Sequence, residues 1–216
     1  MDKSTVPSKV KEIKQSFRLM MDGSVAQSIR NKGVDYKLNW GATLPRLQEM
    51  ADGLKADPSL QSPACKYDLA IALWKENIRE CKILATLLMP ADKMLPEVCD
   101  IWMEQIPSQE IAEQAAFNLW RHLPYAPEKA YQWIASDKVY NQLCGFHVLT
   151  RLFIDKREPN ERGINEFLDQ ALSALQGSSL SVRKAAMQSV IRFSELGLVY
   201  ERMAKSALKS VNLDIF

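Results

Sequence analysis

Carboxylate and tryptophan side chains gather in the segment CDIWMEQIPSQEIAEQAAFNLW, which spans residues 99–120. Its glutamates are Glu104, Glu110 and Glu113. A carboxylate beside aromatic faces can stabilise positive charge that develops on a substrate. However, an acid in the first turn of a helix also interacts favourably with the helix dipole, and Ser108 is a suitable N-cap for such a helix. Glu110 therefore has a catalytic and a purely structural interpretation, and both stay open.

Other catalytic signatures are missing from the sequence. It has no phosphate-binding glycine loop, no G-x-S-x-G elbow and no H-E-x-x-H helix. Of the two histidines, His147 lies in the apolar run GFHVLTRLF, which is typical of a partly buried histidine. His122 follows Trp120 and Arg121 at the expected end of a helix, where it can meet carbonyl dipoles.

The cysteines show no close-spaced pair of the kind that binds zinc. Each falls among apolar residues, so we predict buried thiols in a reducing compartment, and neither a metal site nor a cofactor. The four positions are Cys65, Cys81, Cys99 and Cys144.

Basic residues recur near the ends of the expected helices. If the second helices of successive hairpins line the concave side of a solenoid, these cations form one positive groove that can contact phosphate groups. Nearby aromatic residues would add faces for a base or sugar. The alternative is that the cations only solvate exposed faces and the tryptophans belong to the core. The basic positions are Arg79, Lys82, Arg121, Arg151, Arg183 and Lys184, with Arg192 further along the last of these helices.

The sequence pattern predicts that all the elements that position these residues are helices. Glycine is scarce, with 8 residues in the chain, and apolar residues recur at helical spacing between proline and glycine breakers. We predict an all-α fold with about a dozen short helices that pair into hairpins of the HEAT or armadillo type and form a right-handed superhelix. The expected organisation is a single helical-repeat domain over residues 1–216.

Residues 64–89 illustrate how the helices are divided. Periodicity alone allows one long helix, but Asn77 followed by Glu80 has the spacing of a capping box. We therefore predict a break at Asn77 and two helices joined almost without a loop. Pro63 after Ser62 suits the start of the first helix, because proline needs no donor in the first turn.

Composition places the chain among folded soluble proteins, with 47% hydrophobic and 25% charged residues. The net charge of +2 shows no global basicity, so nucleic-acid binding would depend on charge gathered on one face. The beginning MDKSTVPSKVKE has no apolar signal core, and no run is long enough to span a membrane. A cytoplasmic location without membrane association is expected.

Several segments resemble the AlkD-like DNA alkylation repair family, the HEAT-like repeat alkylpurine DNA glycosylase superfamily. They are LAIALWKENIRECKILATLL, GVDYKLNWGATLPRLQEMA and the helices that begin at DIWMEQIP. The resemblance covers about residues 20–155, and residues 161–210 read as HEAT-like helices. It implies an α-superhelix whose basic concave face grips duplex DNA, and active members excise N3- or N7-alkylated purines with an Asp beside aromatic residues.

The chain departs from the family pattern at the residues that carry the family's catalytic chemistry. Four residues after Trp102 stands Ile106, and an alignment on the following Ile-Ala pair puts Gln109 at the Asp position, beside Glu110. Likewise, Tyr140 could stand for the Trp of the family's Trp-x-Arg-Arg helix start, but the arginines are replaced. The resemblance and the basic pattern together predict DNA contacts from Arg79, Lys82, Trp102, Gln109, Arg121, His122, Tyr140, Arg151, Arg183 and Lys184.

Three functions remain open from the sequence. The first is a DNA-binding member of the superfamily that recognises damaged or alkylated duplex DNA and has altered or lost excision. The second is a helical-repeat scaffold that binds a protein partner. The third is an active glycosylase for N3- or N7-alkylated purines, with Glu110 as the substitute carboxylate.

Overall fold

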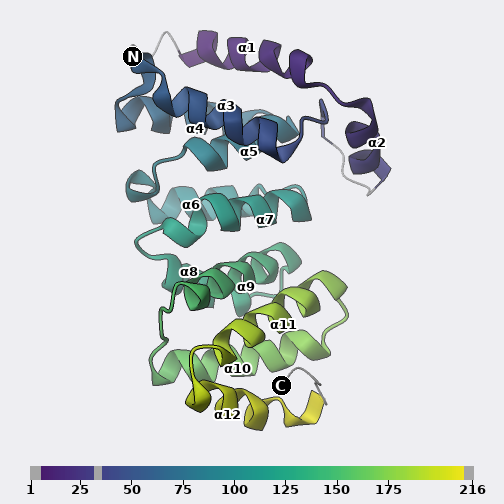
Figure 1. Ribbon diagram of the computed structural model, residues 1–216, viewed down its shortest axis with the longest axis vertical. Helices are drawn as coiled ribbons and strands as arrows, with labels where there is room; N and C mark the ends of the chain where they lie inside the picture. The colour runs from purple at the N-terminus through teal and green to yellow at the C-terminus, as the bar shows by residue number, and fades with distance from the viewer. Residues whose placement is uncertain (1–5, 32–35, 212–216) are drawn as a thin grey trace. The chain divides into compact units, whose positions relative to one another are not determined.

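The computed structural model describes residues 6–31 and 36–211, and Figure 1 shows helices throughout these ranges. The all-α prediction is confirmed: the described residues contain twelve α-helices and no strand beyond an isolated parallel bridge between Leu38 and Ile78. The helices are α1 Val6–Ser16, α2 Gly23–Asn31, α3 Leu44–Ala56, α4 Pro63–Lys75, α5 Arg79–Leu88, α6 Pro96–Glu104, α7 Gln109–Asn118, α8 Ala126–Ile134, α9 Val139–Ile154, α10 Glu161–Gln176, α11 Leu180–Ser194 and α12 Leu198–Ala207. Short 3-10 turns lie between them, among them η4 at Trp120–His122. No described helix is long and apolar enough to cross a membrane.

The chain divides into two compact units, residues 1–114 and residues 115–216. In the first unit α4 packs on α5, and α1 and α3 add to this pair. In the second unit α9 is central and packs on both α8 and α11, while α10 and α12 pack on α11. The organisation of residues 1–216 as one domain stays a prediction.

The predicted break between α4 and α5 is confirmed, but the predicted capping box is wrong. Helix α4 ends at Lys75 and α5 begins at Arg79. Ile78 is the N-cap residue of α5 and its side chain makes no capping hydrogen bond, so Asn77 does not cap the helix. Glu80 instead accepts hydrogen bonds from the backbone of residues 40–42. Pro63 occupies the first turn of α4, as its missing N–H predicts.

Close packing in the second unit depends on Gly145 in α9. A Cβ there would lie 2.8 Å from the carbonyl oxygen of Ala130 and 2.7 Å from a side-chain carbon of Ile134, both in α8. Any larger residue would therefore force the two helices apart. Aromatic rings from α9, α10 and α11 also contribute to the core of this unit, with Phe153, Phe167 and Phe193 in mutual edge or tilted contact. All four cysteines are buried, as predicted.

Candidate nucleic-acid interface

Arg79 is the first residue of α5, and its guanidinium is enclosed by acceptors of the same unit. Its Nε and Nη2 donate to the two carboxylate oxygens of Glu110 at 2.8 and 2.7 Å. Its Nη1 donates to the carbonyl oxygen of Ala42 at 2.8 Å and to Oε1 of Glu80 at 3.3 Å. Burial alone would lower the pKa of Arg79, but the two glutamates raise it above its usual value. With 2% of the residue exposed, Arg79 directs its charge into the protein.

Glu80 binds a turn of backbone that lies about 40 residues earlier in the chain. Its Oε1 accepts from the amides of Trp40, Gly41 and Ala42 at 3.2, 2.9 and 3.3 Å. Successive amides that converge in this way form an anion-binding nest, and here the anion is a fully buried side chain. Gly41 makes the turn possible, because its φ is +73° and a Cβ would lie 2.1 Å from the carbonyl oxygen of Asp22.

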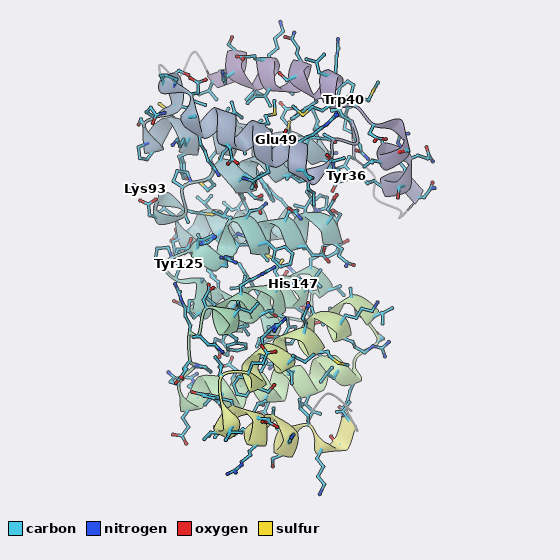
Figure 2. The ribbon with its side chains drawn as sticks, in the orientation of Figure 1. Tyr36, Trp40, Glu49, Lys93, Tyr125 and His147 are labelled. Atoms are coloured by element: carbon cyan, nitrogen blue, oxygen red, sulfur yellow. The ribbon has the colours of Figure 1, made fainter. Side chains whose placement is uncertain are left out.

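This turn belongs to the segment between α2 and α3 that carries Tyr36 and Trp40, both labelled in Figure 2. The hydroxyl of Tyr36 lies 2.7 Å from Oγ of Ser108, and burial raises the pKa of Tyr36 to about 12. Ser108 also accepts from the amide of Ile111 at 3.3 Å, so it is the N-cap of α7 that the sequence predicts. Residues 33–35 of the family-like stretch 33–51 lie outside the described residues.

The carboxylate of Glu110 forms an ion pair with the guanidinium of Arg79. It is the second residue of α7, and its side chain is 30% exposed. Both oxygens accept from Arg79, and because the same guanidinium also pairs with Glu80, it offsets part of the charge of Glu110. A carboxylate stabilises a cationic transition state through its uncompensated charge, and Arg79 offsets that charge here. The catalytic role of Glu110 stays a prediction that this geometry does not favour.

Trp102 and Lys82 are brought together, but in the core of the first unit. The rings of Trp102 and Trp74 stack with centroids 4.1 Å apart and planes 3° from parallel. Lys82 places its Nζ 4.4 Å from the centre of the Trp74 ring and donates to the carbonyl oxygen of Trp74 at 2.9 Å. Burial lowers the pKa of Lys82. Since Trp102 is 2% exposed and Lys82 is 7% exposed, this cluster stabilises the fold.

Gln109 and the other two glutamates lie at the surface of the first unit or close to it. Gln109 begins α7, is exposed and donates to Glu113 at 2.8 Å. Glu104 is exposed at the end of α6. In the described residues, no group of three or more His, Cys, Asp or Glu side chains is arranged to hold a metal ion.

The second unit presents its predicted residues differently. Arg121 and His122 follow α7 in η4, and Nε of Arg121 donates to Nε2 of His122 at 3.2 Å. Burial and then the neighbouring Arg121 lower the pKa of His122, so this exposed imidazole is neutral near pH 7. Tyr140, the second residue of α9, is 36% exposed. Trp120 and Trp133, in contrast, are buried against each other.

Arg183 and Lys184 are exposed in the first two turns of α11 and have no ion-pair partner among the described residues. They border a groove of about 710 Å³. The remaining lining residues are mostly apolar: Leu175, Leu180, Met187, Gln188, Ile191 and Val211. Arg151, in the last turn of α9, places its guanidinium carbon 4.7 Å from the centre of the Phe117 ring.

The fold defines a HEAT-like helical-repeat protein, and the comparisons with known proteins give its family. The model of the DNA alkylation repair enzyme family matches residues 13–194, and the chain belongs to this family. No curated protein matches the sequence.

One solved structure has a similar fold, with a TM-score of 0.78 and 15% sequence identity. The match covers 93% of this chain and 82% of the other. That protein is described as one of "a new family of proteins related to the HEAT-like repeat DNA glycosylases with affinity for branched DNA structures". At this identity the likeness establishes the fold alone.

Proposed function

We propose that this protein binds duplex DNA, including damaged or alkylated DNA, and does not use Glu110 to excise bases. Membership of the DNA alkylation repair family over residues 13–194 is the observation that carries the proposal. The affinity for branched DNA described for the protein of similar fold supports the same class of partner.

The proposed contacts come from side chains whose charge or ring is available. Arg183 and Lys184 are exposed and unpaired among the described residues, which suits electrostatic contacts to phosphate groups. Tyr140 offers an exposed ring for a sugar or base. Arg121, His122 and Arg151 belong to the proposed set as well.

Arg79, Lys82 and Trp102 have another role in this proposal. Their polar atoms and ring faces are used in contacts within the first unit, so we assign them to stabilising that unit. Gln109 stays a predicted DNA contact, because it is exposed at the first turn of α7.

The test combines binding and excision on the same DNA. Single-turnover incubation uses duplexes that contain N7-methylguanine or N3-methyladenine, followed by strand scission at abasic sites and a gel shift at several salt concentrations. Glu110→Gln is compared with Glu113→Gln, which removes one charge from the same helix but leaves Arg79 paired. We expect salt-dependent binding without excision by any of the three proteins.

Two outcomes would change the proposal. Excision by the wild type that only Glu110→Gln loses would assign the catalytic carboxylate to Glu110. Failure to bind any duplex at low salt would exclude duplex DNA as the partner.

A protein partner is the second candidate function. The groove beside Arg183 and Lys184 favours it, since the groove has an apolar floor and Leu180 is 57% exposed. An exposed apolar surface of this kind is typical of protein interfaces. Retention of a partner by the wild type in the absence of DNA, and its loss in Leu180→Asp, would support this function.

A further inference from the structure

The second unit contains a cluster of one aromatic and two polar side chains to which no joint role has yet been assigned. Its members are Phe117, His147 and Arg151. His147, labelled in Figure 2, and Arg151 are four positions apart on α9, so they share one face of that helix. The His147 ring meets the Phe117 ring at 5.1 Å and 69°, and the Arg151 guanidinium lies over the same ring at 4.7 Å. Phe117 thus positions both polar groups.

Both polar groups retain unused hydrogen-bonding capacity. Nε2 of His147 and Nε of Arg151 are buried atoms with no hydrogen-bond partner among the described residues. His147 is 9% exposed, whereas Arg151 and Phe117 are half-buried, so the cluster borders the surface. Buried N–H groups are nearly always satisfied in folded proteins, because leaving one unpaired costs free energy.

The two nitrogen atoms without hydrogen-bond partners indicate which kind of ligand would bind them. A guanidinium Nε and an imidazole in its Nε2–H tautomer are both donors, and the guanidinium is always charged. The matching ligand is therefore an anion with acceptor oxygens. We propose that His147 and Arg151 together bind one phosphate group, that of a DNA phosphodiester, and that Phe117 is their positioning residue. This inference rests on the proposed DNA binding.

The protonation of His147 provides a measurable signal of ligand binding, because its pKa depends on nearby charges. Burial, and then Arg151, lower the pKa of His147 to about 4, so the imidazole is neutral near pH 7. The elements packed on α9 carry other ionisable groups: Glu128 and Lys129 on α8, Arg121 and His122 in η4, and Arg183, Lys184 and Arg192 on α11. Among the described residues, Arg151 is the charged group whose field acts on His147.

A bound phosphate must raise the pKa of His147, because an anion favours the protonated imidazole. The affinity is then linked to pH: the complex binds more protons than the free protein, so DNA binding strengthens as the pH falls through the raised pKa. A rise of one unit corresponds to about tenfold tighter binding by the protonated form.

Imidazole nitrogen NMR of the full chain tests this directly. The chain has two histidines, so only the signals of His122 have to be told apart from those of His147, and His122 is itself a proposed DNA contact whose response is followed separately. The pH is varied from 5 to 8 for the free protein, with a short duplex, and with inorganic phosphate. We expect His147 to stay neutral in the free protein and to show a titration step in the DNA complex, while inorganic phosphate gives a smaller shift of the same sign.

Variants separate the site from general electrostatics. Arg151→Gln should remove the ligand-induced change at His147 and weaken DNA binding, whereas Arg162→Gln, which removes one exposed charge from α10, should leave the change at His147 intact. His147→Phe keeps a ring against Phe117 and should weaken DNA binding by about tenfold, the effect of one hydrogen bond to a charged group.

Each outcome bears on a different claim. DNA binding that leaves the His147 signals unchanged would overturn the phosphate site and leave the proposed function standing. No DNA binding at low salt would overturn the proposed function. If, in addition, inorganic phosphate left the His147 signals unchanged, the phosphate site would be overturned too. A response to inorganic phosphate alone would assign the site to a free phosphate and would overturn the assignment to DNA.

Discussion

Arg79 in the first unit and Arg183 in the second carry the same predicted role but have opposite environments. Arg79 is buried and donates to Glu110, Ala42 and Glu80. Arg183 is exposed and has no ion-pair partner among the described residues. Both arginines lie near the start of a helix, so their positions within the helix do not explain why one is buried and paired and the other is exposed. A basic residue is therefore available to contact DNA only where the protein leaves its charge unpaired.

Glu80 and His147 extend this contrast to two other buried polar side chains, one from each unit. Glu80 has a carboxylate oxygen on three backbone amides, so its buried charge is compensated. His147 has a buried nitrogen without a partner among the described residues. The first unit also contains buried atoms without a partner among the described residues, Nε1 of Trp40 and Oε2 of Glu80, so the contrast concerns the Glu80 Oε1 and His147 Nε2 atoms and not the two units as wholes.

Replacement of Arg79 by Ala should have the largest effect on stability. It leaves Glu80 and Glu110 without their common cation, and breaking a buried ion pair from one side costs about 3–5 kcal/mol. Chemical denaturation of the wild type, Arg79→Ala and Arg183→Ala measures this cost, with the Arg183 variant expected within about 0.5 kcal/mol of the wild type. If Arg79→Ala kept its stability and lost DNA binding, the contrast between the two arginines would be wrong.

Replacement of Gly41 by Ala tests the backbone turn that holds Glu80. The left-handed backbone alone should cost about 1–3 kcal/mol in an alanine, and the contact with the carbonyl oxygen of Asp22 adds to it. Gly53 is the matched control, because it lies within α3 and a Cβ there meets no atom within 4 Å. Gly53→Ala should stabilise by roughly 0.5–1 kcal/mol, as alanine favours a helix. Thermal unfolding of both variants checks the two signs, and equal effects would contradict the described turn.

The exposed pair on α11 should affect DNA binding and leave stability unchanged. In the double variant Arg183→Gln/Lys184→Gln, the slope of the logarithm of affinity against the logarithm of salt should fall by about 0.9 for each lost phosphate contact. The control is Arg192→Gln on the same helix, because Arg192 is already paired with Glu195 at 2.7 Å. Fluorescence anisotropy at several salt concentrations measures the slopes. An unchanged slope in the double variant would exclude these two residues from the interface.

The sequence determines the helices because the signals that start and end them are local. Proline in the first turn of α4 and the Ser108 cap of α7 each depend on residues within a few positions. The apolar spacing likewise predicts the burial of the four cysteines. The same local reasoning failed at Glu80, whose spacing from Asn77 imitates a capping box.

Only the tertiary structure decides which charges are satisfied. The partners of Arg79 and Glu80 lie 31 and 39 residues away, at Glu110 and Gly41, and no helical periodicity relates positions so far apart. Whether a tryptophan is exposed or stacked, as Trp102 is on Trp74, also depends on how distant helices pack. Burial and hydrogen bonding of a polar group are set by the whole environment of its atoms, and that environment forms only when the helices come together.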